Sequence, residues 1–106
     1  MKRIKKHFEA KRNIETLQNV LIEYKRLCDL MPRPNGLCWI IDAMKYDDKI
    51  NNDQHFFISQ LLQNEANKLG KHYLMHFIWP LTTKSYRINW LNDQIEEQKK
   101  QLIKLW

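Results

Sequence analysis

The sequence contains very little glycine. Only 2 of its 106 residues are glycine, whereas about 7% is usual in soluble proteins. Phosphate-binding loops, tight hairpins and sheet bulges all need backbone conformations that glycine adopts most cheaply. The shortage therefore argues against a glycine-rich phosphate loop and against a protein rich in β-sheet.

Cysteine is also scarce. Cys28 and Cys38 are too few for the disulfide framework of a small secreted domain, and their spacing fits neither a zinc site nor a C-x-x-C redox pair. Because both lie among apolar neighbours, we expect buried free thiols with no redox role. This cysteine usage is typical of a cytoplasmic protein.

Long hydrophobic runs are missing. The longest nearly apolar stretch, residues 73–81, is interrupted by His76 and Pro80 and is too short to span a bilayer. The start of the chain is charged and does not resemble a signal peptide. We therefore expect a cytoplasmic location and no membrane partner.

The residues that are present can form one compact domain. Hydrophobic residues make up 43% and charged residues 28% of the chain, which also has four each of Trp, Tyr and Phe. This composition is close to ordinary globular usage and supplies enough apolar surface for a core. The length excludes a two-lobed enzyme, so we expect a single domain over residues 1–106.

The positive charge is concentrated at the beginning of the chain. Residues 1–12 carry six basic side chains against one acidic side chain, while the rest carries 12 basic and 11 acidic ones, for a net charge of +6. A basic segment of this kind can attract phosphate or an acidic partner. It is equally typical of the solvated first turns of a helix.

Two long stretches show apolar residues at helical spacing. Steps of three and four residues define both stripes: Ile14, Leu17, Leu21, Tyr24, Cys28 and Met31 in the first, and Ile88, Leu91, Ile95, Gln98, Leu102 and Leu105 in the second. The first predicts a helix over about residues 4–30, which Pro32 and Pro34 end. The second predicts a helix that starts at Thr83 or Ser85 as N-cap and ends near residue 105.

Two shorter helices are predicted between these. One covers about residues 36–46, and the other covers about 53–69 and ends before Gly70. The N-cap of the second is either Asn51, with Gln54 three residues later, or Asn52 beside Asp53. Residues 71–83 are too apolar for a solvated loop, so we predict a short extended segment there, with a helical turn ending at Trp79 as the alternative. The fold class is therefore all-α: a small four-helix domain with a basic N-terminal helix, residues 1–30, and a body, residues 36–106.

No catalytic or metal-binding pattern is complete. His72 and His76 have helical i, i+4 spacing, but the glutamate of a zincin motif and a third ligand are lacking. The acidic stretch from residue 47 lacks the glycine and final glutamate of an EF-hand. Neither Ser59 nor Ser85 has a recognisable base together with an orienting group nearby in sequence. We expect no enzyme activity, no metal and no cofactor.

A cluster of aromatic and basic residues surrounds the start of the last helix. We predict six ligand-binding residues in it: Trp79, Lys84, Ser85, Tyr86, Arg87 and Trp90. The charge of Arg87 in the first turn opposes the helix dipole unless an anion lies beside it. Its guanidinium could hold phosphate oxygens, and Trp79 could stack on a base. Alternatively, Trp79 and Trp90 pack in the core.

Under that alternative, Arg87 pairs with an internal acid, namely Asp42, Asp47 or Asp48.

Three short motifs carry a resemblance to a known group of proteins. They are Gly-Leu-Cys at residues 36–38, Phe-Ile-Trp-Pro at 77–80 and Arg-Ile-Asn-Trp-Leu at 87–91. Over residues 36–95 the chain resembles small, mostly uncharacterised proteins of tailed bacteriophages. The resemblance implies a phage origin, and therefore the cytoplasm of the host cell as the location.

Phage genomes use many small accessory genes to disable host defence. We therefore expect a non-enzymatic counter-defence protein that sequesters an anionic nucleotide immune signal, such as a cyclic oligonucleotide. The alternatives are an inhibitor that binds a host defence protein and a small nucleic-acid-binding protein. We also expect a homo-oligomer, because the two apolar stripes together with Trp39 and Trp106 exceed what so small a bundle can bury.

Overall fold

A computed structural model describes residues 2–31, 35–70 and 79–105, which are helical apart from short connections. The long helices are α1 (Lys2–Leu30), α2 (Leu37–Tyr46), α3 (Asn52–Lys68) and α5 (Lys84–Lys104). Residues 79–81 form a further helical turn, and no residue of the described ranges belongs to a strand. The predicted all-α fold is confirmed.

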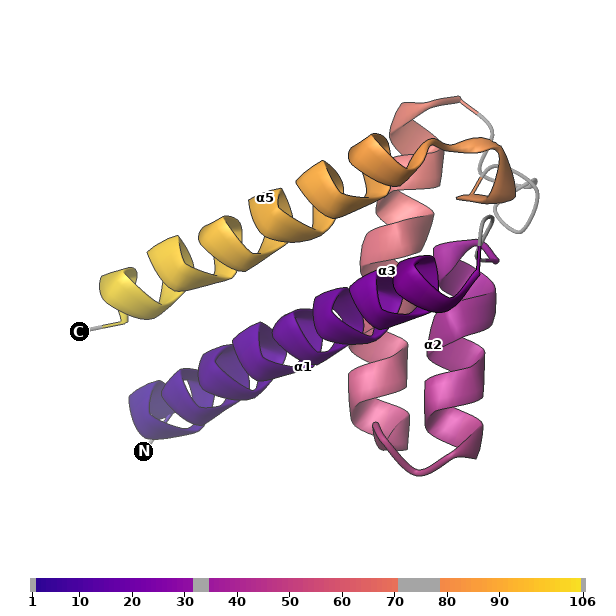
Figure 1. Cartoon of the computed structure of the whole chain (residues 1–106). Helices are drawn as coiled ribbons and strands as arrows, with labels where there is room; N and C mark the ends of the chain where they lie inside the picture. The colour runs from indigo at the N-terminus through magenta and orange to yellow at the C-terminus, as the bar shows by residue number, and fades with distance from the viewer. Residues whose placement is uncertain (1, 32–34, 71–78, 106) are drawn as a thin grey trace.

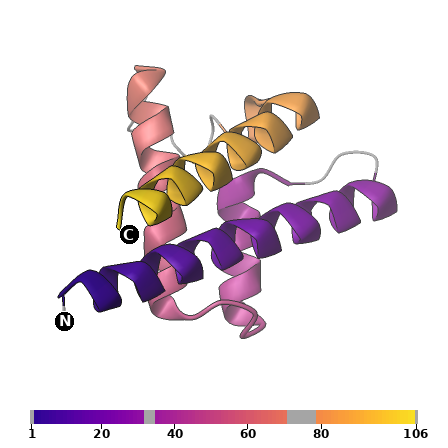
Figure 2. The same cartoon turned by 90° about the vertical axis from the view of Figure 1, so that its left-hand side faces the viewer.

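The four long helices form two antiparallel pairs (Figures 1 and 2). The first and last helices, α1 and α5, run side by side, and the pair formed by α2 and α3 crosses them. The molecule measures 45 × 30 × 23 Å. In Figure 1 the N-terminal part of α1 and the C-terminal part of α5 extend together beyond the α2–α3 pair.

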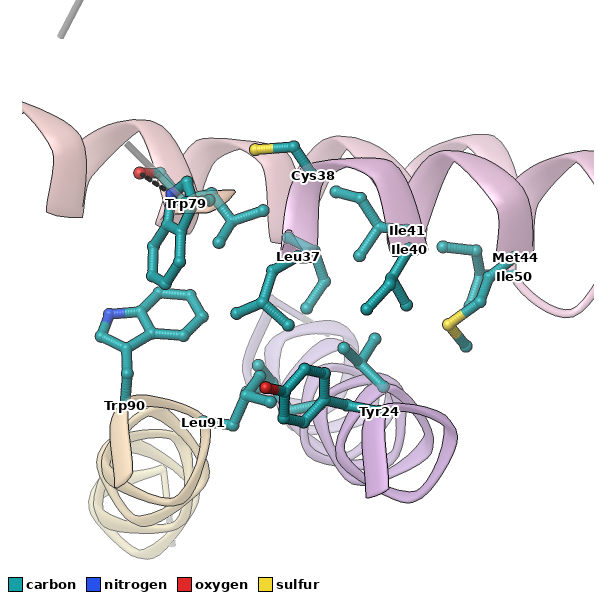
Figure 3. Packing of buried hydrophobic residues seen from close by; sticks show 14 of the residues in the cluster. Tyr24, Leu37, Cys38, Ile40, Ile41, Met44, Ile50, Trp79, Trp90 and Leu91 are labelled. Carbon is teal, nitrogen blue, oxygen red and sulfur yellow. Dashed lines mark hydrogen bonds between the residues drawn. The ribbon is translucent and has the colours of Figure 1, made fainter. Parts of the chain in front are cut away.

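The core lies where the four helices meet (Figure 3). Its most deeply buried aliphatic and aromatic side chains come from every long helix: Leu17, Val20 and Tyr24 from α1, Leu37, Ile40 and Ile41 from α2, Ile58 and Leu62 from α3, and Leu91 from α5. Both predicted stripes supply this core. Met31, the last residue of the first predicted stripe, is instead 43% exposed, because it follows the last residue of α1.

The helix ends follow ordinary capping chemistry. Asn51 accepts from the Gln54 backbone N–H at 2.9 Å, and the Gln54 side chain accepts from the Asn51 N–H at 2.8 Å, which is a complete capping box. Thr83, and not Ser85, caps α5 by accepting from the Tyr86 N–H at 3.1 Å. Gly70 has φ +75° after α3, as predicted for a left-handed C′ residue.

The segment predicted to be extended lies mostly outside the described residues, and so do His72 and His76. Of its described part, residues 79–83, residues 79–81 are helical and not extended, whereas Thr83 has extended backbone. The Thr82 N–H and hydroxyl both donate to the carbonyl of Trp79, at 3.3 and 2.7 Å. This turn closes over Pro80 without needing an N–H from the proline, which is why Pro80 does not prevent it.

Candidate functional site

Arg87 is the centre of the predicted aromatic and basic cluster. Its side chain is almost completely buried, with 4% exposure. The guanidinium donates from Nε to Thr82 Oγ1 (2.9 Å), from Nη1 to the Tyr24 hydroxyl and the Asn35 carbonyl (3.3 Å each), and from Nη2 to the carbonyls of Trp79 (2.8 Å) and Pro80 (3.2 Å). These bonds give each of the three guanidinium nitrogens at least one acceptor.

These contacts explain why a cation occupies the first turns of α5. The carbonyls of Trp79 and Pro80 end the preceding helical turn, where carbonyl groups carry partial negative charge. The acceptors that the described residues offer to Arg87 are neutral oxygens, so the alternative prediction of an aspartate partner is wrong. Asp42 instead contacts His55, with 2.6 Å between Oδ1 and Nε2.

The two tryptophans pack against each other inside the fold (Figure 3). Trp79 is fully buried, and its Nε1 donates to the Leu62 carbonyl at 3.4 Å. Its ring meets Trp90 edge-on, with centroids 4.9 Å apart and planes at 61°, a favourable aromatic geometry. A base could stack on Trp79 only if neighbouring side chains moved.

The indole N–H of Trp90 differs from that of Trp79. It is buried and has no hydrogen-bond partner within the part of the chain that the structure describes. Figure 3 shows it pointing away from Leu37 and Leu91. A buried donor without an acceptor costs free energy, so this N–H is the group of the cluster best placed to receive an acceptor from elsewhere.

The remaining predicted residues lie at the edge of the cluster or outside it. Tyr86 is half-buried and donates its hydroxyl to Glu65; burial, and then this carboxylate, raise the pKa of Tyr86 to about 12. Lys84 and Ser85 are exposed on the first turn of α5. The structure thus brings together Trp79, Tyr86, Arg87 and Trp90 and leaves Lys84 and Ser85 apart.

Gly36 connects this cluster to the start of α2. A Cβ on Gly36 would lie 2.8 Å from the backbone nitrogen of Pro80 and 3.0 Å from the carbonyl carbon of Trp79. Only glycine permits two backbone segments to approach so closely. The described parts of the three sequence motifs, residues 36–38, 79–80 and 87–91, therefore meet at one junction, which holds α2 and α5 to the turn between them.

A second candidate surface lies at the opposite end of α5. We define the basic arm as residues 2–13 of α1 and 98–105 of α5, whose sequences contain nine of the 18 basic residues and one of the 12 acidic residues. The two segments flank one open hollow of about 450 Å³, whose lining includes Lys6 and Asn13 of α1 and Gln101 and Lys104 of α5. The rest of the chain has nine basic and 11 acidic residues, so the molecule is positive at one end.

Six lysines of the basic arm have exposed side chains: Lys5, Lys6, Lys11, Lys99, Lys100 and Lys104. Two carboxylates lie near its cations: Asp53 is 3.8 Å from Arg12, and Glu96 is 3.5 Å from Lys99. Both pairs are largely exposed and therefore neutralise little of the field. This arrangement can attract a polyanion.

The charge pattern along the chain indicates a basic surface in the first 12 residues alone. It misses Lys99, Lys100 and Lys104 because these are far away in the chain. The signal that could have found them is the antiparallel pairing of the two long helices, which places the C-terminal lysines beside the N-terminal ones.

Comparisons of the chain with protein-family models, curated proteins and solved structures find no match. Across residues 2–31, 35–70 and 79–105, no three His, Cys, Asp or Glu side chains are grouped so as to hold a metal ion. None of the helices in these ranges has the length and apolar character needed to cross a membrane.

Proposed function

We propose that the protein binds nucleic acid through the basic arm and acts by occupancy, without catalysis. The observation that carries this proposal is the separation of charge: the arm has nine basic residues and one acidic residue, and the remainder of the chain is net negative. The basic stretch of α1, residues 2–12, is about 16 Å long at 1.5 Å per residue. Duplex DNA carries one phosphate per roughly 1.7 Å of axis, so several phosphates lie within reach.

The predominance of lysine in the basic arm favours the phosphate backbone of a nucleic acid over an acidic protein as the binding partner. Seven of the nine cations are lysine and two are arginine. Protein interfaces are enriched in arginine and depleted in lysine, whereas lysine serves as a mobile point charge for phosphate. An inhibitor that binds a host protein through this arm is therefore the less favoured alternative.

The resemblance to small bacteriophage proteins supports a counter-defence role for such binding. A stoichiometric binder can cover nucleic acid that a host defence system must reach, and it needs no active site to do so. A compact helical chain with a basic arm suits this mode of action.

Salt dependence tests the proposal. Binding of labelled oligonucleotides should weaken steeply between about 50 and 200 mM salt, because each neutralised phosphate releases counterions. We expect four or more phosphate contacts, which correspond to a slope of log K against log salt of about −3 or steeper. Absence of binding at about 50 mM salt, or a slope near zero, would contradict the proposal.

Capture of a nucleotide at the Trp79–Arg87–Trp90 cluster is a second candidate, favoured by the unpartnered buried N–H of Trp90. A ligand acceptor at that nitrogen would satisfy it. Calorimetric titration with cyclic dinucleotides tests this function, with Trp90→Phe as the variant that keeps a ring and removes the N–H. Affinity that falls in Trp90→Phe and depends little on salt would favour this candidate over the basic arm.

A further inference from the structure

An apolar patch lies on the basic arm. Phe8 and Ile4 are 65% and 57% exposed, and they line an open hollow of about 480 Å³ together with Lys5, Glu9 and Arg12. All five lie on one side of α1, because residues three and four apart are neighbours on a helix. The aromatic ring therefore has a cation within one turn on either side.

We propose that Phe8 is a stacking platform for an unpaired base, so that the arm takes single-stranded nucleic acid in preference to duplex. This inference rests on the proposed function and names the form of nucleic acid. An exposed ring beside lysine and arginine offers two contacts at once, a flat apolar face for a base and charges for the flanking phosphates. A duplex can use only the charges, since its bases already stack on each other.

Glu9 fits the same assignment. It is the one acidic residue of the arm, and it lines the hollow beside Phe8. Its carboxylate would repel a phosphate, but it can accept a hydrogen bond from the exocyclic amino group of a base. Both N–H bonds of that amino group are free in an unpaired base, whereas base pairing uses one of them in a duplex and leaves the other in the groove.

Other occupants of the patch fit less well. A second copy would bring two arms together, each with nine basic residues and one acidic residue, and such like charges repel. A membrane surface needs a helix with a broad apolar face, whereas the basic arm exposes three large apolar side chains within its described residues, at Ile4, Phe8 and Ile103. The charge of the arm therefore selects a polyanion.

The test uses fluorescence anisotropy with a labelled single strand of about 12 nucleotides and a duplex of the same length. Phe8→Ala is compared with wild type and with Phe56→Ala. Phe56 is also 65% exposed but lies on α3, so that it controls for loss of an exposed phenylalanine. Because Phe8 is exposed, Phe8→Ala should retain the circular dichroism spectrum and melting temperature of wild type.

We expect Phe8→Ala to weaken single-strand binding about 10-fold, as loss of one stacking contact implies, and to change duplex binding less than about twofold. Phe56→Ala should change neither. If Phe8→Ala leaves both affinities unchanged or lowers both equally, the stacking role is wrong, while salt-dependent binding still supports the proposed function. If wild type binds neither oligonucleotide but binds anionic phosphatidylserine vesicles in a Phe8-dependent way, both inferences are overturned.

Discussion

The guanidinium of Arg87 joins segments that are far apart in the sequence. It donates to oxygens of Tyr24 in α1, Asn35 before α2 and the turn containing Trp79 and Pro80. Hydrogen bonds from a buried charged group are stronger than neutral ones, and removing the donor leaves buried acceptors unsatisfied. These contacts support a structural role for Arg87, which organises the fold around the start of α5.

Replacing Arg87 should therefore destabilise the protein. We expect Arg87→Ala to lower the free energy of unfolding by about 3–5 kcal/mol, measured by urea denaturation. Arg87→Lys should recover little of this loss, because an ammonium cannot reproduce the planar fork of five donors. Unchanged stability combined with loss of nucleotide capture would instead make Arg87 a ligand-binding residue.

High pH should destabilise the fold through the buried Cys38 thiol and the half-buried Tyr86 hydroxyl. Burial, with Asp42 nearby, raises the pKa of the Cys38 thiol to about 12 from 9.0 in the unfolded chain, and the pKa of Tyr86 is about 12 against 10.0. Above pH 9, and further above pH 10, the unfolded state releases protons that the folded state keeps, so the free energy of unfolding falls as pH rises toward 12.

Denaturation at a series of pH values measures this effect. Cys38→Ala should remove the part that begins near pH 9 and leave the part from Tyr86. Stability that stays constant from neutral pH to pH 11 would show that neither group is shielded in the folded state.

At the scale of the helices, local signals predicted most of the structure. Proline, glycine and capping residues fixed the ends of α1, α2 and α3 because they act on the backbone within a few residues. Spacing located the buried faces of α1 and α5. The turn at residues 79–81 could not be predicted in this way, since its stability depends on Arg87 and on the close approach of Gly36, contacts that periodicity does not encode.

The capping box of α3 also reaches α1. Besides capping Asn51, Gln54 donates from Nε2 to the buried Thr16 hydroxyl at 2.9 Å. We expect Asn51→Ala to cost about 1 kcal/mol of stability, and Gln54→Ala to cost more, because it also leaves Thr16 without this donor. Thermal denaturation checks both, with exposed Asn92→Ala as the control. A cost of Gln54→Ala no greater than that of Asn51→Ala would show that the link to α1 contributes nothing.

At the scale of the whole molecule, the order of the residues does not show where the positive charges gather in space. Folding brings Lys99, Lys100 and Lys104 to the end of the molecule that already carries the basic start of α1. Three of the six candidate site residues, Trp79, Arg87 and Trp90, are buried in the junction. Sequence alone could not show this, because aromatic and arginine side chains serve packing and ligand binding equally well. Trp39 is 60% exposed, as expected for a contact between copies, and the homo-oligomer remains a prediction.

The most direct test reverses the same amount of charge at two different places on the molecular surface. Lys11→Glu with Lys100→Glu reverses two exposed charges on the basic arm, and Lys25→Glu with Lys45→Glu reverses two exposed charges on the rest of the molecule, giving variants of equal net charge. The measurement is oligonucleotide affinity at about 100 mM salt, where phosphate contacts still dominate binding. We predict that the arm variant loses at least about 10-fold in affinity and about two units of salt slope, while the other variant changes little. Equal losses in the two variants would mean that net charge alone drives binding and that the basic arm is not the site.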